Sequence, residues 1–230
     1  MSVTLDMMEY SSDAAAQAAY VSSDAGNTAH YPPAHSDTYV KVSSKYSTNF
    51  WPYYATDPAL SLSGAWELKA WVSANGSYTN QRFNIDIGSA MIIARIYLEN
   101  GQSGGITQYG IKDFILQGSN DSRALAQTNY ASDTYWTDVE TGLQARQGTK
   151  DGTDPQYFTI DSSIPYKYYS LKIDNQWSGA NYMSIRHVEL QGPNLQSYSE
   201  DTIKTQGSYS LKGVALITDS LNDTLTRTIA

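Results

Sequence analysis

Apolar and polar residues alternate in several short stretches of the chain, a period of two that is typical of β-strands with one face in a core. The clearest is "QRFNIDIG", where Phe83, Ile85 and Ile87 point to one side and the polar residues between them to the other, with Gly88 closing the strand. The same series continues in "MIIARIYLEN", "IKDFILQGS", "QYFTID", "YKYYSLKID" and "MSIRHVELQG". Strands without alternating helices predict an all-β antiparallel sandwich or barrel.

The stretch "DFILQGSNDS" changes abruptly from apolar to small polar residues. Gly118 is predicted to let the chain turn out of the sheet, because glycine adopts backbone conformations that other residues avoid. Residues 119–121, Ser-Asn-Asp, then satisfy backbone groups in the loop with their side chains.

The chain divides into three segments. Residues 1–30 contain "SSDAAAQAAYVSSDAGN", which predicts a short Ala-rich helix capped by Ser12 or Asp13. Residues 31–192 hold the predicted sandwich. Residues 193–230 contain two further strand patterns, "GSYSLKGVALI" and "NDTLTRTI", which are too few for a stable sheet of their own. We therefore expect the third segment to pair with the first, or the chain to be a fragment of something longer.

Composition excludes several classes of partner. The formal net charge is −8, and the 15 Lys and Arg residues are scattered, so no basic stripe for nucleic acid or anionic lipid is present. No apolar run approaches the roughly 20 residues of a membrane span, and no secretory signal is visible at the N-terminus. The chain has no cysteine, which removes disulfides and thiolate chemistry.

The order "NQRFNIDIG", "IARIYLENG", "IKDFILQGSND", "YWTDV", "DPQYFTID", "YKYYSLKI" and "YMSIRHVELQG" resembles the discoidin domain, the coagulation-factor type C module with a galactose-binding-like fold. The resemblance covers residues 36–192. It implies a jelly-roll sandwich in which loops at one end bind carbohydrate. It also implies that Phe114 and Leu116 are core positions of a central strand and that Trp71 and Trp136 lie in the core. The flanking segments resemble pieces of a second jelly-roll carbohydrate-binding module.

Two loops have the composition of a sugar site, which needs an aromatic ring for the apolar sugar face and polar groups for the hydroxyls. They are "NFWPYYATD" (49–57) and "DNQWSGANY" (174–182). The candidate ligand-binding residues are Trp177, Tyr182, Asn175, Asn181, Gln176, Trp51, Tyr53 and Arg82. For Trp66, both a ligand contact and a core position agree with the sequence. The plain alternative for each ring is packing, and for Arg82 and Arg186 it is a solvated strand face.

No catalytic motif is present, so we expect no enzymatic activity. No metal site and no cofactor are predicted either. Many relatives of the discoidin-like fold hold a structural calcium ion through an early acidic motif and a glutamate in the last strand. Here the segment that replaces the early acidic motif, "ATDPALSLSG", offers Asp57 as its single candidate ligand. His187 stands at the position of the last-strand glutamate, and Glu189 lies two residues further on. The loss of a carboxylate puts that calcium site in doubt.

These observations predict a non-catalytic carbohydrate-binding or adhesion module. It would belong to a larger protein of a cell surface or virion, such as a phage tail or fibre, and act extracellularly or on the virion surface. The expected partner is a glycan or cell-surface polysaccharide, and a homo-oligomer would compensate for weak single sites. The alternatives are a structural assembly module whose aromatic loops contact a neighbouring subunit, and an accessory domain of a hydrolase.

Overall fold

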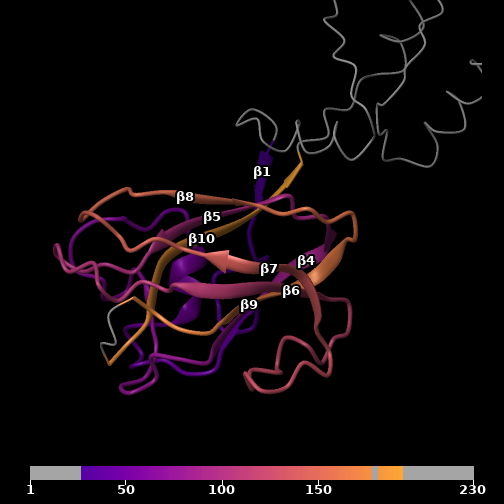
Figure 1. Ribbon diagram of the computed structural model, residues 1–230, viewed down its shortest axis with the longest axis horizontal. Coiled ribbons are helices and arrows are strands. Elements are labelled where there is room, and N and C mark those ends of the chain that lie inside the picture. The colour runs from indigo at the N-terminus through magenta and orange to yellow at the C-terminus, as the bar shows by residue number, and fades with distance from the viewer. Residues whose placement is uncertain (1–26, 178–180, 194–230) are drawn as a thin grey trace, which may run out of the picture. The chain divides into compact units, whose positions relative to one another are not determined.

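The computed structural model describes residues 27–177 and 181–193, which form two antiparallel sheets facing each other (Figure 1). The first sheet has the order β1-β10-β5-β8, with β3 also paired to β10, and the second has the order β2-β4-β9-β6-β7. The strands of the first sheet are β1 (Asn27–His30), β3 (Trp71–Val72), β5 (Arg95–Asn100), β8 (Gln156–Thr159) and β10 (Ser184–Pro193). Those of the second are β2 (Val40–Val42), β4 (Gln81–Met91), β6 (Asp113–Ser119), β7 (Thr137–Gln144) and β9 (Tyr166–Ile173). The predicted all-β antiparallel sandwich is confirmed.

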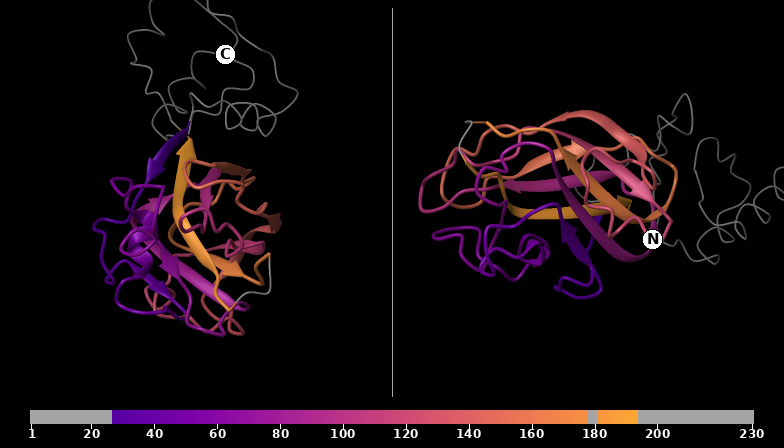
Figure 2. Two further views of the ribbon diagram at one scale, coloured as in Figure 1. Left: turned by 90° about the vertical axis from the view of Figure 1, so that its left-hand side faces the viewer. Right: turned by 90° about the horizontal axis from the view of Figure 1, so that it is seen from below.

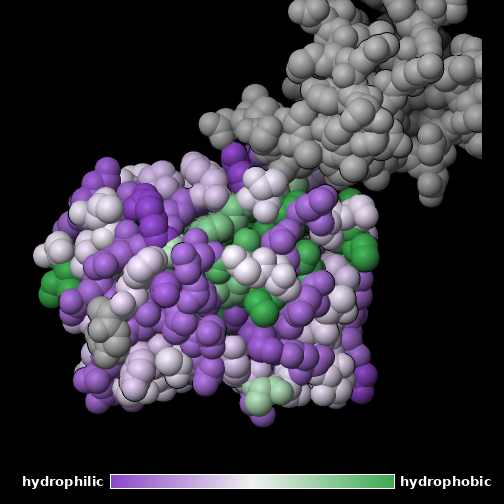
Figure 3. All heavy atoms as spheres, viewed as in Figure 1, coloured by the Kyte–Doolittle hydropathy of each residue, from purple (hydrophilic) through white to green (hydrophobic). Residues whose placement is uncertain are grey.

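The core lies between the two sheets, where the inward-pointing residues of each strand meet. Phe83 and Ile85 of β4 are buried there, as predicted from the alternation, and so are Phe114 and Leu116 of β6, as the resemblance implied. The predicted framework residue Trp71 is fully buried beside Phe83. Apolar atoms also reach the surface between β7 and β8, the edge strands of the two sheets (Figure 3).

The outer face of the second sheet is also buried over β4, β6 and β9, which the alternation did not predict. Arg82 and Asn84 point to that face and are fully buried, because the long loop at residues 120–136 lies across it. Trp136, at the end of this loop, packs with Ala124 and Tyr168 in a separate apolar cluster. Its predicted burial is confirmed, but it belongs to this outer cluster and not to the core between the sheets.

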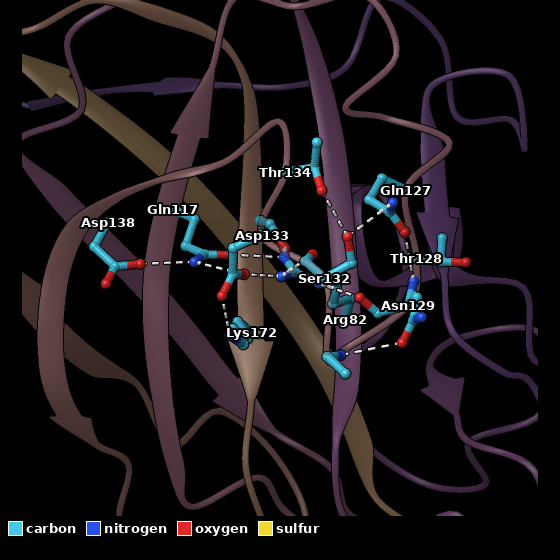
Figure 4. Close-up of polar contacts among 12 residues, drawn as sticks. Arg82, Gln117, Gln127, Thr128, Asn129, Ser132, Asp133, Thr134, Asp138 and Lys172 are labelled. Atoms are coloured by element: carbon cyan, nitrogen blue, oxygen red, sulfur yellow. Dashed lines mark hydrogen bonds and ion pairs between the residues drawn. The ribbon is translucent and has the colours of Figure 1, made fainter.

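Arg82 holds the covering loop in place (Figure 4). Its guanidinium donates to the carbonyl oxygens of Asn129 and Ser132, both at 3.0 Å, and forms an ion pair with Asp133. It also donates to Gln117 Oε1 on β6 at 2.6 Å. A guanidinium has five N–H donors in a fixed fork, so one buried arginine can join a loop to two strands.

The role predicted for Gly118 is wrong. The residue does not end the strand: it lies inside β6, paired with Tyr169 of β9 and Thr137 of β7. A Cβ atom at this position would lie 2.3 Å from the Tyr166 ring, so glycine is required by close packing and not by a turn. The polar residues that follow do cap the loop as predicted: Ser119 Oγ accepts from Asp121 N at 3.1 Å.

The compact unit of the described residues begins at Asn27, and β1 lies beside the end of β10 (Figure 2). The predicted N-terminal helix, the predicted C-terminal strands and their pairing lie outside the described residues. The division of the chain at residues 31 and 193 stays a prediction.

One end of the sandwich gathers five loops, on the left in Figure 1. Strands β4, β6, β8 and β10 begin at this end, and β5, β7 and β9 finish there, as the antiparallel registers require. The loops comprise residues 43–70, 73–80, 101–112, 145–155 and 174–183. Three of them supply the aromatic residues described next.

Candidate functional site

Five aromatic side chains form a closed ring at the loop end of the sandwich. Their centroids are 5.6 Å apart for Tyr46 and Phe50, 5.7 Å for Phe50 and Trp66, 5.1 Å for Trp66 and Tyr109, 6.2 Å for Tyr109 and Tyr182, and 5.1 Å for Tyr182 and Tyr46. Most pairs meet edge to face, the arrangement that the charge distribution of aromatic rings favours. Three loops that are distant in sequence are therefore joined by their rings.

Four of these rings line a hollow that we call the aromatic hollow, with a volume of about 350 Å³. It is lined by Tyr46, Ser47, Asn49, Phe50, Trp66, Glu67, Val72 and Tyr182. Phe50 and Val72 are buried and form its base, whereas Tyr46 is 51% exposed at the rim. The volume lies at the small end of the range of ligand pockets, and apolar rings with a few polar groups are the usual lining of such a pocket.

Backbone hydrogen bonds fix the walls of the aromatic hollow. Tyr46 N donates to Val72 O at 2.9 Å, and Leu68 N donates to Asn49 O at 2.8 Å, which ties the two arms of the loop together. Leu68 has a φ of 60°, a left-handed conformation that is costly for a residue with a branched side chain. The turn from Trp66 to Lys69 is closed by a 3.0 Å bond, so this strained residue helps to present Trp66 and Glu67 to the hollow.

Arg186 of β10 anchors the loop that carries Trp66. Its side chain is almost fully buried, and its guanidinium donates to the carbonyl oxygens of Ser61, Ser63, Gly64 and Gln102 at 2.7 to 3.4 Å. All its bonds among the described residues are to carbonyl oxygens, and no carboxylate pairs with it. Burial lowers the pKa of Arg186, and the charges of Asp151 and Glu67 act in the opposite direction. The expectation of a solvated Arg186 is therefore wrong.

The predicted loop 174–182 contributes one residue to the aromatic hollow, Tyr182. Trp177 has other neighbours: its indole N–H donates to Ala145 O at 2.8 Å, and Lys112 Nζ lies 5.1 Å from its ring. Trp177 remains 37% exposed, so part of its ring is open to solvent. Its role as a ligand contact stays a prediction.

The three amide residues predicted beside Trp177 differ in accessibility. Asn175 donates to Asp113 Oδ2 at 2.9 Å and accepts from Asp113 N at 3.2 Å, which caps the start of β6. Gln176 is only 7% exposed and forms a β-bridge with Ile111, so the prediction that it contacts a ligand is corrected to a buried structural role. Asn181 is exposed, and its carbonyl accepts from Gly76 N at 2.8 Å.

Trp51 and Tyr53 line a second, smaller hollow of about 190 Å³ together with residues 35–37. Their rings are stacked, with centroids 5.8 Å apart, and Lys45 Nζ lies 3.9 Å from the Trp51 ring centre. Both contacts use the face of the indole, which leaves it less suited to stack on a sugar. These two residues are thus separate from the aromatic hollow, and their role in ligand binding stays a prediction.

The predicted ligand contact of Arg82 is corrected by its surroundings. The side chain is fully buried, and its donors are committed to loop 120–136 and to β6. No part of the guanidinium is open to a ligand in this conformation.

The residues considered for calcium have other partners. Glu189 accepts from Tyr31 at 2.5 Å and from Gln191 at 2.8 Å, and His187 lies 3.1 Å from it. Asp57 accepts from Ala59 N at 2.9 Å. Among the residues that the structure describes, no group of three or more His, Asp or Glu side chains is arranged to hold a metal ion. The absence of a cofactor remains a prediction.

Sequence reasoning missed most of the aromatic hollow. It included Asn49 and Phe50 only as part of a loop and left Trp66 undecided, and it did not single out Tyr46, Tyr109 or Glu67. An available signal was that aromatic residues recur in three segments between predicted strands. Nothing in the sequence states which of these segments meet in space.

No protein-family model matches the chain, and no curated protein matches it. Similar solved structures are carbohydrate-binding modules. One is chitosan-binding module 1 of a chitosanase/glucanase from Paenibacillus sp. IK-5, with 22% identity, 65% of this chain and 91% of that chain covered, and a TM-score of 0.44. Another is the family 32 carbohydrate-binding module of C. perfringens NanJ in complex with galactose. It has 16% identity and a TM-score of 0.44, and the match covers 72% of this chain and 98% of that chain. A third, from a family 31 glycoside hydrolase of Clostridium perfringens, has 14% identity, coverage of 67% and 92%, and a TM-score of 0.47.

These structures are of the class that the sequence resembles. The resemblance is confirmed for the fold by the two facing antiparallel sheets of this chain. In the described part of the chain, no helix has the length and hydropathy needed to cross a membrane.

Proposed function

We propose that this chain is a non-catalytic carbohydrate-binding module and that the aromatic hollow is its binding site. The observation that supports this proposal most is the partly exposed ring set of Tyr46, Trp66 and Tyr182 around a hollow of about 350 Å³ with polar groups at its edge. A sugar ring presents apolar C–H faces to such rings and hydroxyls to the polar groups. Asn49 and Ser47 supply neutral polar side chains at that edge.

The context that we propose is extracellular. The module would serve adhesion as part of a larger surface or virion protein, such as a phage tail or fibre. A hollow that is open on one side and made of few groups gives weak binding to a single sugar. Several copies, in a homo-oligomer or along a fibre, would raise the effective affinity without any new contact.

A glycan array followed by calorimetric titration tests the proposal. We expect binding to at least one class of glycan, and we expect Tyr182→Ala to weaken it roughly 5- to 30-fold, because one aromatic contact contributes about 1–2 kcal/mol. Tyr157→Ala is the matched control: Tyr157 is 51% exposed on β8 and does not line the aromatic hollow. Its removal should leave the affinity unchanged.

The alternative is a structural assembly module, in which the aromatic loops contact a neighbouring subunit. The array distinguishes the two functions. If no glycan binds and Tyr182→Ala instead lowers the mass of a self-assembled species in light scattering, the carbohydrate proposal is wrong and the assembly function replaces it.

A further inference from the structure

Among the described residues that line the aromatic hollow, Glu67 is the one that carries a charge. The remaining lining residues are aromatic, aliphatic or neutral polar, and no lysine, arginine or histidine is among them. A ligand that enters therefore meets a negative charge and the negative faces of aromatic rings, without a compensating cation in the lining.

The Glu67 carboxylate has no partner among the described residues. Its side chain is exposed and makes no hydrogen bond or ion pair within residues 27–177 and 181–193. The charge of Glu67 raises the pKa of Arg186, but the two side chains form no hydrogen bond, because the N–H groups of Arg186 donate to carbonyl oxygens of the neighbouring loop segments. Lys45 lies against the Trp51 ring, beside the smaller hollow. Thus Glu67 is open to a cationic ligand.

The position of Glu67 is fixed relative to the rings. It follows Trp66 directly and lies within the turn that the Lys69 N to Trp66 O bond closes. The left-handed Leu68 holds this turn in its conformation. A carboxylate and the faces of neighbouring aromatic rings are the groups that together bind an ammonium ion.

We infer that the aromatic hollow selects sugars that carry a protonated amine, such as glucosamine units, over N-acetylated and carboxylate-bearing sugars. This inference rests on the proposed function. The ammonium group would contact Glu67 while the sugar ring packs on Trp66. N-acetylation removes the charge, and a uronate would place a second carboxylate beside Glu67, which is unfavourable.

The test is a calorimetric titration of the full chain with glucosamine oligomers and with N-acetylglucosamine oligomers of the same length, at about pH 5.5, where the amine of glucosamine is largely protonated. We expect the amine form to bind roughly 5- to 20-fold more tightly, as a partly exposed charge pair with a cation–π contact allows. Glu67→Gln should abolish this difference while the N-acetylated oligomer binds within about twofold of wild type.

Asp161→Asn is the matched control, because it removes the same charge from an exposed site in the loop between β8 and β9, at the opposite end of the sandwich. It should keep the preference for the amine. Equal binding of the two oligomers, or a preference that survives Glu67→Gln, overturns the inference and leaves the proposed function in place. If neither oligomer binds but another glycan on the array does, the inference alone is overturned; failure of every glycan on the array overturns the proposed function itself.

Discussion

Replacing Arg186 with methionine tests how the aromatic hollow is held in shape. The substitution keeps a long side chain but removes five N–H···O contacts to the carbonyls of Ser61, Ser63, Gly64 and Gln102. The two shortest, at 2.7 and 2.9 Å, contribute about 1–1.5 kcal/mol each, and the three at 3.2–3.4 Å about 0.5 kcal/mol each. Water recovers part of this at the exposed Ser61 and Ser63, so we expect a loss of about 2–3 kcal/mol.

Thermal unfolding followed by tryptophan fluorescence measures this loss, which corresponds to a fall in Tm of roughly 5–10 °C for a domain of this size. Binding is the more specific readout. Because Arg186 anchors the segment that leads to Trp66, we expect the affinity for a glycan ligand to fall at least about 10-fold at temperatures where the variant is fully folded. Arg186→Lys should recover little, since one ammonium cannot span four carbonyls.

Arg82→Met is the matched control for this experiment. It also removes a buried guanidinium, but one that holds loop 120–136 on the outer face of the second sheet. We expect a comparable loss of stability with binding within about twofold of wild type. The assigned link between Arg186 and the aromatic hollow is refuted if Arg186→Met lowers stability but binds as wild type does. It is also refuted if Arg82→Met loses as much affinity as Arg186→Met.

Three further predictions concern packing, pH and the second candidate ring. Gly118→Ala should destabilise the fold by about 1–3 kcal/mol in urea denaturation, because its Cβ would meet the Tyr166 ring at 2.3 Å. In the control Gly148→Ala the Cβ would lie 3.5 Å from its nearest neighbour, so stability should change by less than about 0.5 kcal/mol. Equal losses in the two variants would contradict the packing argument. Burial raises the pKa of Glu189, but hydrogen bonds from His187, Tyr31 and Gln191 outweigh it and lower that pKa to about 2. Since the pKa of Glu189 is lower in the folded than in the unfolded state, Glu189 stabilises the fold above about pH 4.5, and this contribution is lost as the pH falls toward 2. Glu189→Gln should therefore reduce the loss of stability at acid pH. An unchanged loss would show that the hydrogen bonds to Glu189 are not its cause. Trp177→Ala should weaken glycan binding less than Tyr182→Ala in the same titration, because Trp177 does not line the aromatic hollow, and the reverse order would move the site to Trp177.

The alternation of residues predicted the fold because each strand buries one face in a shared core. Phe83 and Ile85 were identified from spacing alone, since a period of two places them on the same side of their strand, whereas Phe114 and Leu116 were identified through the resemblance to the discoidin domain. The expectations for the surroundings of Arg82 and Gly118 were wrong. Their environments depend on loop 120–136 and on the Tyr166 ring, which are contacts across the fold that local patterning does not contain.

The candidate site was predictable in kind but not in composition. The end of the sandwich and an aromatic residue of the last long loop were both expected, and Tyr182 does line the aromatic hollow. The other rings come from segments separated by more than 20 residues from it, and only the strand registers bring them together. Loops with similar compositions therefore ended in different places: Trp51 lies beside residues 35–37 and Trp177 beside Ala145.

A crystal structure of the chain with its best glycan from the array would show where the ligand lies. We expect a sugar ring packed on Trp66, between Tyr46 and Tyr182, with its polar groups toward Asn49 and Glu67. A sugar seated on Trp177 instead, or an aromatic hollow filled by side chains of a neighbouring copy while the glycan is bound elsewhere, would contradict this expectation.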